Sequence, residues 1–162
     1  MQDNYIIPAS TRVGHVHLKV TDLKRSLEFY CGLLGFEITL LYGDEAAFIS
    51  AGGYHHHIGL NTWFNKGGSK AEKNTVGLFH TALVYPSKRD LAVIYNRLKD
   101  SKYPLTGASD HGVSLAIYLD DPDGNGVELY WDRPKEEWPK NVDGSLMMYS
   151  KRLYIDDLLG DL

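Results

Sequence analysis

Two histidines and one glutamate occupy places from which they could bind a single metal ion. His15 begins the alternating segment G-H-V-H-L-K-V, His80 begins a similar segment later in the chain, and Glu128 lies in D-P-D-G-N-G-V-E-L-Y-W. Taken alone, a strand histidine is more often structural than a ligand, and Glu128 could be an ordinary outward-facing residue. Together, two imidazoles and one carboxylate on adjacent strands form a face that leaves positions open on Fe(II) or a similar metal. Substrate and oxygen could bind at those positions.

The elements around His15 predict a βαβββ order. The segment from Gly14 predicts a strand, and T-D-L-K-R-S-L-E-F-Y-C-G-L-L-G-F predicts a helix because its apolar residues recur at 3.6-residue spacing. Thr21 or Asp22 can cap the first turn of this helix, and Gly35 can supply a left-handed residue at its end. Extended segments separated by glycine-containing turns are predicted at 36–42, 46–51 and 55–63.

The same order of elements returns after a polar linker at 65–74. Ser87 followed by Asp90 predicts the start of a helix. A shift of 65 residues superposes His15 on His80, which indicates a duplicated module. The elements predicted in the second copy are a strand at 77–85, a helix at 88–100 and strands near positions 105, 116 and 128.

The duplication predicts an α+β fold in which two paired βαβββ modules form a half-barrel metal cup. The single domain is predicted at 12–134, with module one at about 12–64, module two at about 75–134 and a C-terminal tail at 135–162. The tail is rich enough in apolar residues to pack, either on its own domain or on a second subunit. We expect the cup to form within one chain; exchange of modules between chains is the alternative, and a homo-oligomer stays open.

Composition excludes several classes of protein. The 162 residues include 17 basic and 21 acidic side chains, for a net charge of −4, and no basic run that would bind nucleic acid. No apolar run approaches the roughly 18 residues of a membrane span. With Cys31 as the one cysteine, and no signal-peptide pattern in Met1–Asn4, the expected location is the cytoplasm.

Three motifs give the chain a family resemblance. They are G-H-V-H-L-K-V-T-D-L-K-R-S-L-E-F-Y, F-H-T-A-L-V and Y-L-D-D-P-D-G-N-G-V-E-L-Y. Residues 12–134 resemble the vicinal-oxygen-chelate superfamily of glyoxalases, bleomycin-resistance proteins and extradiol dioxygenases, and resemble most closely the metal-bearing half of catechol 2,3-dioxygenases. The resemblance implies that the metal ligands are His15, His80 and Glu128, with Fe(II) as the expected metal and Mn(II) or another divalent ion as the alternative.

The same resemblance implies catalytic residues. The segment Y-H-H-H-I-G-L is similar to the one that carries an acid–base histidine in extradiol enzymes, which selects His56, whereas strand alternation favours His57. A surface triplet of histidines is the structural alternative. Tyr118 has the family's ten-residue spacing to Glu128 for a tyrosine that binds the substrate oxygen, although a tyrosine there could also be a core aromatic. His111, in S-D-H-G-V-S, resembles the histidine of the active-site loop.

One position distinguishes between reactions of this family. Superposing I-G-L on V-E-L places Gly59 where glyoxalase I enzymes carry a fourth protein ligand. Three ligands favour an extradiol ring-cleaving dioxygenase that binds a small catechol-like aromatic and O2. A glyoxalase-like lyase or isomerase is the alternative, and a metal-free small-molecule binding protein is the least favoured, because it would leave both histidines and Glu128 unused.

Overall fold

The computed structural model describes residues 4–70, 72 and 74–160, and in them the βαβββ order occurs twice. The first module consists of β1 (Val16–Lys19), α1 (Leu23–Leu27), the π-helical segment η1 (Glu28–Leu33), β2 (Glu37–Tyr42), β3 (Ala46–Ser50) and β4 (Ile58–Asn61). The second consists of β5 (Thr81–Val84), α2 (Lys88–Asp100), β6 (Gly107–Asp110), β7 (Ser114–Asp120) and β8 (Gly126–Asp132). The predicted α+β fold of two βαβββ modules is confirmed.

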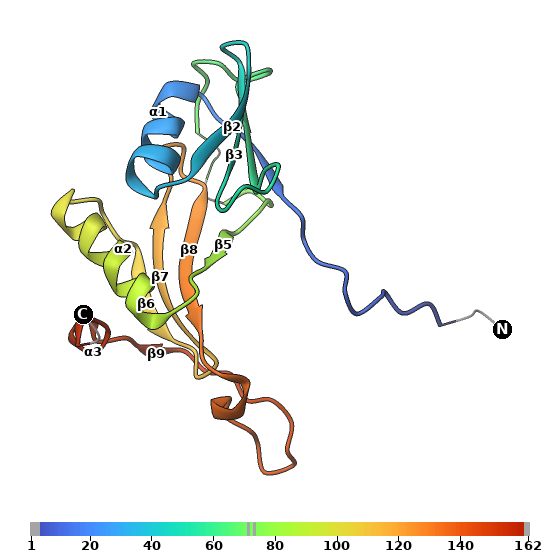
Figure 1. Cartoon of the computed structure of the whole chain (residues 1–162), viewed down its shortest axis with the longest axis vertical. Helices are drawn as coiled ribbons and strands as arrows, with labels where there is room; N and C mark the ends of the chain where they lie inside the picture. The colour runs from blue at the N-terminus through green and yellow to red at the C-terminus, as the bar shows by residue number, and fades with distance from the viewer. Residues whose placement is uncertain (1–3, 71, 73, 161–162) are drawn as a thin grey trace.

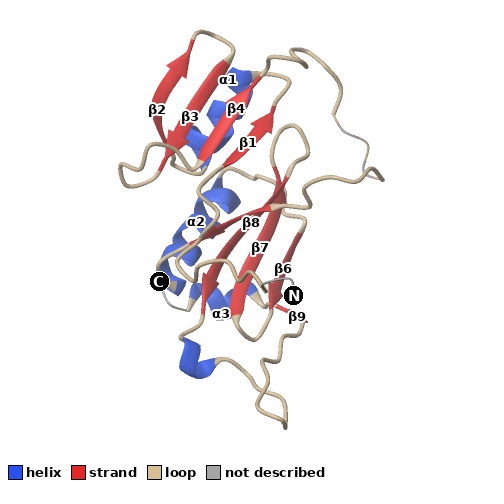
Figure 2. Cartoon of the chain, turned by 90° about the vertical axis from the view of Figure 1, so that its right-hand side faces the viewer, coloured by secondary structure: helices blue, strands red, loops and turns tan. Residues whose placement is uncertain are grey.

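Each module builds its own mixed sheet with the same connectivity. The strand orders are β1-β4-β3-β2 and β5-β8-β7-β6-β9, where β9 (Lys151–Arg152) is added by the C-terminal tail. The first strand of each module pairs in parallel with the last. The two sheets lie one above the other along the long axis of the molecule (Figure 2). Helices α1 and α2 cover the same side of both sheets, so the opposite faces are left open (Figure 1).

The helix termini follow the predicted capping residues. Asp22 caps α1 by accepting a hydrogen bond from Arg25 N, and Ser87 caps α2 by accepting one from Asp90 N. Gly35 follows the first helix with a φ of 88°, the left-handed conformation that glycine adopts readily. The first helix differs from the prediction in one respect, because it continues from α1 into the wider π-helical segment η1.

Three predicted strands begin at least two residues later in the structure. Pairing of β5 with β8 begins at Thr81 opposite Val127, so residues 77–80 have no strand partner. In the same way β1 starts at Val16, opposite Ile58. Residues 55–57 belong to the loop before β4, which begins at Ile58. His15 and His80 therefore lie just ahead of their strands.

Residues of the first helix and its N-terminal end connect module one to the turn before β8 in module two. The buried Tyr30 hydroxyl donates to Asp121 Oδ2 at 3.0 Å, and Thr21 Oγ1 donates to Asp123 Oδ1 at 2.6 Å. Asp121 also accepts from the backbone N–H groups of Asp123 and Asn125, which fixes the D-P-D-G-N turn. Polar groups of module one thus bind to a turn that module two supplies.

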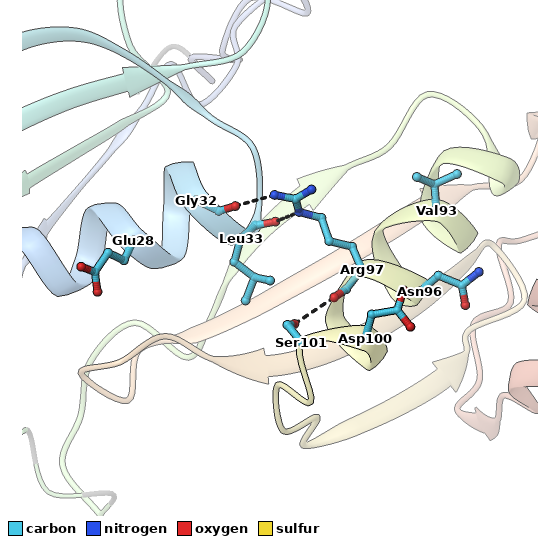
Figure 3. Close-up of a pocket in the computed structure, with 8 residues that line it drawn as sticks. All are labelled: Glu28, Gly32, Leu33, Val93, Asn96, Arg97, Asp100 and Ser101. Carbon is cyan, nitrogen blue, oxygen red and sulfur yellow. Dashed lines mark hydrogen bonds between the residues drawn. The ribbon is translucent and has the colours of Figure 1, made fainter.

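Arg97 makes a second link between the modules. Its guanidinium donates to the carbonyl oxygens of Leu33 at 2.7 Å and Gly32 at 2.5 Å, across an open pocket between η1 and α2 (Figure 3). These carbonyls lie at the C-terminal end of the first helix, where such groups lack helical partners. The pocket contains none of the predicted metal or catalytic residues.

The C-terminal tail packs on its own chain. It forms the 3-10 turn η2 (Lys135–Glu137), the short strand β9 (Lys151–Arg152) and the helix α3 (Ile155–Leu159). Strand β9 pairs with β6, while Leu153 and Leu158 are buried. Within the described part of the chain, no helix has the length and apolar character needed to cross a bilayer. Residues 1–3 of the signal-peptide interpretation, residues 71 and 73 of the linker and residues 161–162 of the tail lie outside the described residues.

Candidate metal and catalytic site

Strand β8 places Glu128 on the open face of the second sheet. Its neighbours Val127 and Leu129 are buried in the core, so side-chain alternation directs Glu128 to the opposite face. Its carboxylate has two close partners: His80 Nε2 lies 2.9 Å from Oε2, and the Tyr118 hydroxyl donates to Oε1 at 3.0 Å. Tyr118 is directly opposite Glu128 in the β7–β8 ladder. The structure thus gives Glu128 the partners that an inward-facing carboxylate needs.

His111 extends this contact chain. Its Nε2 atom lies 2.6 Å from the Tyr118 hydroxyl, and its ring comes from the loop between β6 and β7. Four of the six predicted site residues, namely His80, Glu128, Tyr118 and His111, therefore form one continuous series of polar contacts on module two. We refer to these four residues as the module-two cluster.

The environment of Tyr118 keeps its hydroxyl protonated. Burial raises the pKa of Tyr118 well above its usual value, and the negative charge of Glu128 and the hydrogen bond to it raise the pKa further. At neutral pH the side chain is therefore a hydrogen-bond donor and not a phenolate. A donor in this position could bind an anionic oxygen of a ligand.

The remaining two predicted site residues meet on module one. The rings of His15 and His56 have centroids 4.3 Å apart, and His56 also contacts the ring of Phe48. Burial lowers the pKa of His56, and the neighbouring histidines, His15 first among them, lower it further. His56 therefore favours the neutral form, which can accept a proton.

The structure distinguishes the members of the histidine triplet. His57 Nδ1 lies 3.0 Å from Ser50 Oγ and accepts from Ala51 N at 3.3 Å, so this ring is bound to the turn after β3. His55 Nδ1 lies 2.7 Å from Nδ1 of His56. Of the two candidates, His56 is the one whose ring contacts His15. This geometry favours His56 as the acid–base residue, whose catalytic role stays a prediction.

Gly59 occupies the place on module one that Glu128 occupies on module two. In the β1–β4 ladder His17 is opposite Gly59, and in the β5–β8 ladder Ala82 is opposite Glu128. A Cβ atom at Gly59 would lie only 2.9 Å from the His17 ring, which therefore covers this position. Module one thus pairs the imidazole of His17 with Gly59, whereas module two pairs Ala82 with the carboxylate of Glu128.

The predicted ligands are divided between the two sheets. Glu128 lies on the second sheet and His80 just ahead of it, whereas His15 lies just ahead of the first sheet. In the part of the chain that the structure describes, no three His, Cys, Asp or Glu side chains gather closely enough to hold a metal. The three-ligand site therefore stays a prediction.

Two of the three predicted ligands nevertheless have the chemistry of a metal site. A nitrogen and an oxygen each about 2.1 Å from one ion lie about 3 Å apart when the angle at the ion is near 90°, and His80 Nε2 and Glu128 Oε2 are 2.9 Å apart. The Nδ1 atom of His80 is buried and finds no hydrogen-bond partner among the described residues. Imidazole and carboxylate together suit Fe(II) and Mn(II), so the residues present fit such an ion.

One contributor to the cluster could not be found from residue types. His111 Nδ1 lies 3.0 Å from the backbone carbonyl oxygen of Tyr149, in the C-terminal tail. A main-chain carbonyl is present at every residue, so no motif marks this one. The apolar content of the tail, which predicts packing, was the one available signal.

Residues 12–129 match the family described as the Glyoxalase/Bleomycin resistance protein/Dioxygenase superfamily. The chain is 35% identical over 154 residues to the catechol-2,3-dioxygenase of Bacillus subtilis (strain 168), which covers 94% of the chain and 53% of that protein. It is 34% identical over 124 residues to the biphenyl-2,3-diol 1,2-dioxygenase 3 of Rhodococcus globerulus, covering 75% of the chain and 63% of that protein. The chain thus spans little more than half the length of these curated relatives.

Among solved structures, the fold is similar to a glyoxylase/bleomycin resistance protein/dioxygenase domain from Frankia sp. EAN1pec. The TM-score is 0.63 at 26% identity, and the match covers 77% of this chain and all of that domain. The family match ends at residue 129, so the C-terminal tail at 135–162 lies beyond that match.

Proposed function

Because the chain belongs to the glyoxalase/bleomycin resistance/dioxygenase superfamily, we propose that it is a metal-dependent extradiol dioxygenase that cleaves a catechol-like ring with O2. The single observation that carries the proposal is the module-two cluster, in which a histidine and a glutamate in ligand-like contact adjoin a protonated tyrosine. The dioxygenases that the chain resembles at 34–35% identity support this reaction over others of the superfamily.

The proposed ligands are His15, His80 and Glu128, holding Fe(II), with Mn(II) as the alternative. When bound, the ion would supply the positive charge that lowers the pKa of a chelated catechol hydroxyl and the open positions and redox chemistry that O2 requires. The three side chains would supply one negative charge and two neutral nitrogens. A chelating catecholate would then add the negative charge that an iron(II) site with one carboxylate can accept.

The other predicted residues act on the substrate and on protons. The protonated hydroxyl of Tyr118 would donate to a substrate oxygen and fix the orientation of the ring. His56, whose lowered pKa favours the neutral imidazole, would accept a proton from the substrate and return it later in the reaction. His111 adjoins Tyr118 and would restrict the position of its hydroxyl.

Reconstitution with Fe(II) under anaerobic conditions, followed by a panel of catechols under air, tests this function. Ring cleavage beside a hydroxyl would give a yellow semialdehyde-type product. The parallel assay with methylglyoxal and glutathione under argon tests the glyoxalase-like alternative, which needs no O2. Turnover only under argon would reject the dioxygenase, and tight binding of an aromatic without turnover in either assay would favour a binding protein.

Assembly of the three proposed ligands has two routes, because His15 lies beside the first sheet whereas His80 and Glu128 lie at the second. Either the sheets of one chain approach each other, or modules are exchanged between two copies. Mixing refolded His15→Ala and His80→Ala chains separates the routes. Exchange would restore one intact site in each mixed dimer, and metal content would rise above that of either variant; within one chain it would stay at the level of the variants.

A further inference from the structure

The C-terminal tail touches the loop that carries His111 through two main-chain contacts. Tyr149 N donates to the His111 carbonyl at 3.2 Å, and the Tyr149 carbonyl lies 3.0 Å from His111 Nδ1. The contact continues into the β6–β9 ladder, where Asp110 is opposite Lys151. His111 is therefore held from its backbone and from its ring by the same residue of the tail.

The carbonyl of Tyr149 decides which ring nitrogen of His111 carries hydrogen. A carbonyl oxygen can only accept, so Nδ1 must be the donor in this contact. In a neutral imidazole the other nitrogen, Nε2, is then an acceptor. That acceptor faces the Tyr118 hydroxyl at 2.6 Å.

Tyr118 consequently has two acceptors for its one hydroxyl hydrogen. Glu128 Oε1 lies 3.0 Å away on one side, and His111 Nε2 lies 2.6 Å away on the other. When Glu128 is engaged elsewhere, His111 Nε2 can accept this hydrogen until a substrate oxygen takes its place as the acceptor. If His111 carried its hydrogen on Nε2, the ring would compete as a donor and this choice would be lost.

The tail is held in place by packing that centres on Gly112. This residue has a φ of 80°, and a Cβ atom there would lie 2.7 Å from the Tyr149 ring and 2.8 Å from Pro139 Cγ. Beyond Tyr149 the chain is anchored by the buried side chains of Leu153 and Leu158. The close approach of Tyr149 to the loop thus depends on the missing side chain at position 112.

We propose that the C-terminal tail is a working part of the candidate site, because the Tyr149 carbonyl fixes His111 as the Nδ1–H tautomer and so presents Nε2 to the Tyr118 hydroxyl. Tyr149 is a positioning residue that acts through its main chain. The effect on turnover rests on the proposed function, whereas the tautomer itself does not. This gives the tail, which lies beyond the family match, a chemical role.

Nitrogen NMR of the histidine rings tests the tautomer without any assay of activity. In uniformly 15N-labelled protein at about pH 8, above the ordinary histidine pKa of about 6.5, His111 should show a protonated Nδ1 and a bare Nε2. The His111→Gln spectrum assigns the signals by their loss. A wild-type spectrum with hydrogen on Nε2 would overturn the proposal, whatever the enzyme catalyses.

Gly112→Ala tests the link between tail and ring, with Gly144→Ala as the matched control. Gly144 also has a left-handed φ, of 82°, but a Cβ atom there would meet nothing within 4 Å. Gly112→Ala should give a mixture of His111 tautomers and lower kcat about tenfold with unchanged metal content, and Gly144→Ala should do neither. Loss of activity with an unchanged tautomer would reject the positioning role. If no ring cleavage is found in the wild type, the proposed function fails while the spectrum still decides the tautomer.

Discussion

The two modules share one connectivity but differ at the position where a carboxylate is needed. On module two, Glu128 is opposite Ala82 in the β5–β8 ladder and contacts His80 and Tyr118. On module one, Gly59 occupies the equivalent place and the ring of His17 covers it. One scaffold thus carries a hydrogen-bonded acid in one copy and a packed imidazole in the other.

This difference teaches how a duplicated fold can divide its tasks. Module two holds an acidic, tyrosine-containing cluster, whereas module one gathers histidines, of which His17 and His56 have pKa values lowered by burial and by neighbouring histidines. A metal ligand set drawn from both would combine one carboxylate with two imidazoles. Each module alone offers only part of that set.

Removal of the Glu128 carboxylate, by which the two modules differ, should have the largest effect, on metal binding. Glu128→Gln retains the size of the side chain but removes its charge, so metal affinity should fall by more than the roughly 10–100-fold typical of an outer-sphere partner. Metal per chain by elemental analysis is the measurement. The control is Glu37→Gln, because Glu37 is exposed on β2. Metal content equal to that of the parent would remove Glu128 from the ligand set.

Substitution of His56 on module one should have the next largest effect, on the rate of ring cleavage. His56→Phe is expected to slow ring cleavage by about 10²–10⁴-fold, the loss usual for a positioned acid–base group, with metal content unchanged. His57→Phe is the control, because His57 is bound to the turn after β3. A slow His57→Phe beside an unaffected His56→Phe would reverse the assignment.

Filling the glycine position should test why module one lacks a carboxylate. Gly59→Ala adds a Cβ atom 2.9 Å from the His17 ring, so the free energy of unfolding should fall by about 1 kcal/mol. The double variant His17→Ala/Gly59→Ala carries at position 17 the alanine that module two has at Ala82. It should recover most of that loss. Urea denaturation measures both. A Gly59→Ala variant as stable as the parent would show that the ring moves aside freely.

The contact between the modules at Tyr103 should give the smallest effect, a loss of stability seen only at alkaline pH. Burial and the charges of Asp121 and Asp120 raise the pKa of Tyr103 to about 12, and its ring packs against Phe29. An unfolded tyrosine ionises near about pH 10, so the folded state keeps a proton that the unfolded state releases. Stability should therefore decline as pH rises from about 10 to about 12.

Comparison of urea midpoints across that range, with Tyr103→Phe as the control, measures this contribution. The variant should lose stability less steeply above about pH 10 than the parent. Parallel curves would show that Tyr103 does not retain its proton on folding.

Much of the fold could be predicted because its signals are local. The helix at Lys88–Asp100 and its Ser87 cap follow from apolar spacing and one capping pair. The equivalence of Gly59 and Glu128 follows from the repeat, and the two ladders agree with it, because Gly59 is opposite His17 and Glu128 is opposite Ala82. The strands beginning at Val16 and Thr81 were predicted too long, because a strand starts where its partner starts and the partner's first residue is not a local signal.

The candidate site could be predicted only as residues and not as an arrangement. His80, Glu128, Tyr118 and His111 lie in one series of contacts, because the β7–β8 register places Tyr118 directly opposite Glu128, while their roles stay predictions. The distance from His15 to that cluster depends on how two sheets are oriented, which no periodicity encodes. The contact of His111 with the tail was also hidden, because it is made by a main-chain carbonyl.

The hydrogen bond from Tyr30 to Asp121 has a consequence for the order in which the chain folds. The two residues are 91 positions apart, so the first helix obtains this buried partner only after most of the second module has been synthesised. Until then the Tyr30 hydroxyl must stay in water, and the first helix cannot complete its packing. We expect the turn at 121–125 to fix the first helix in place only late in folding. Hydrogen exchange during refolding should then show protection of the first helix no earlier than that of the β7–β8 hairpin.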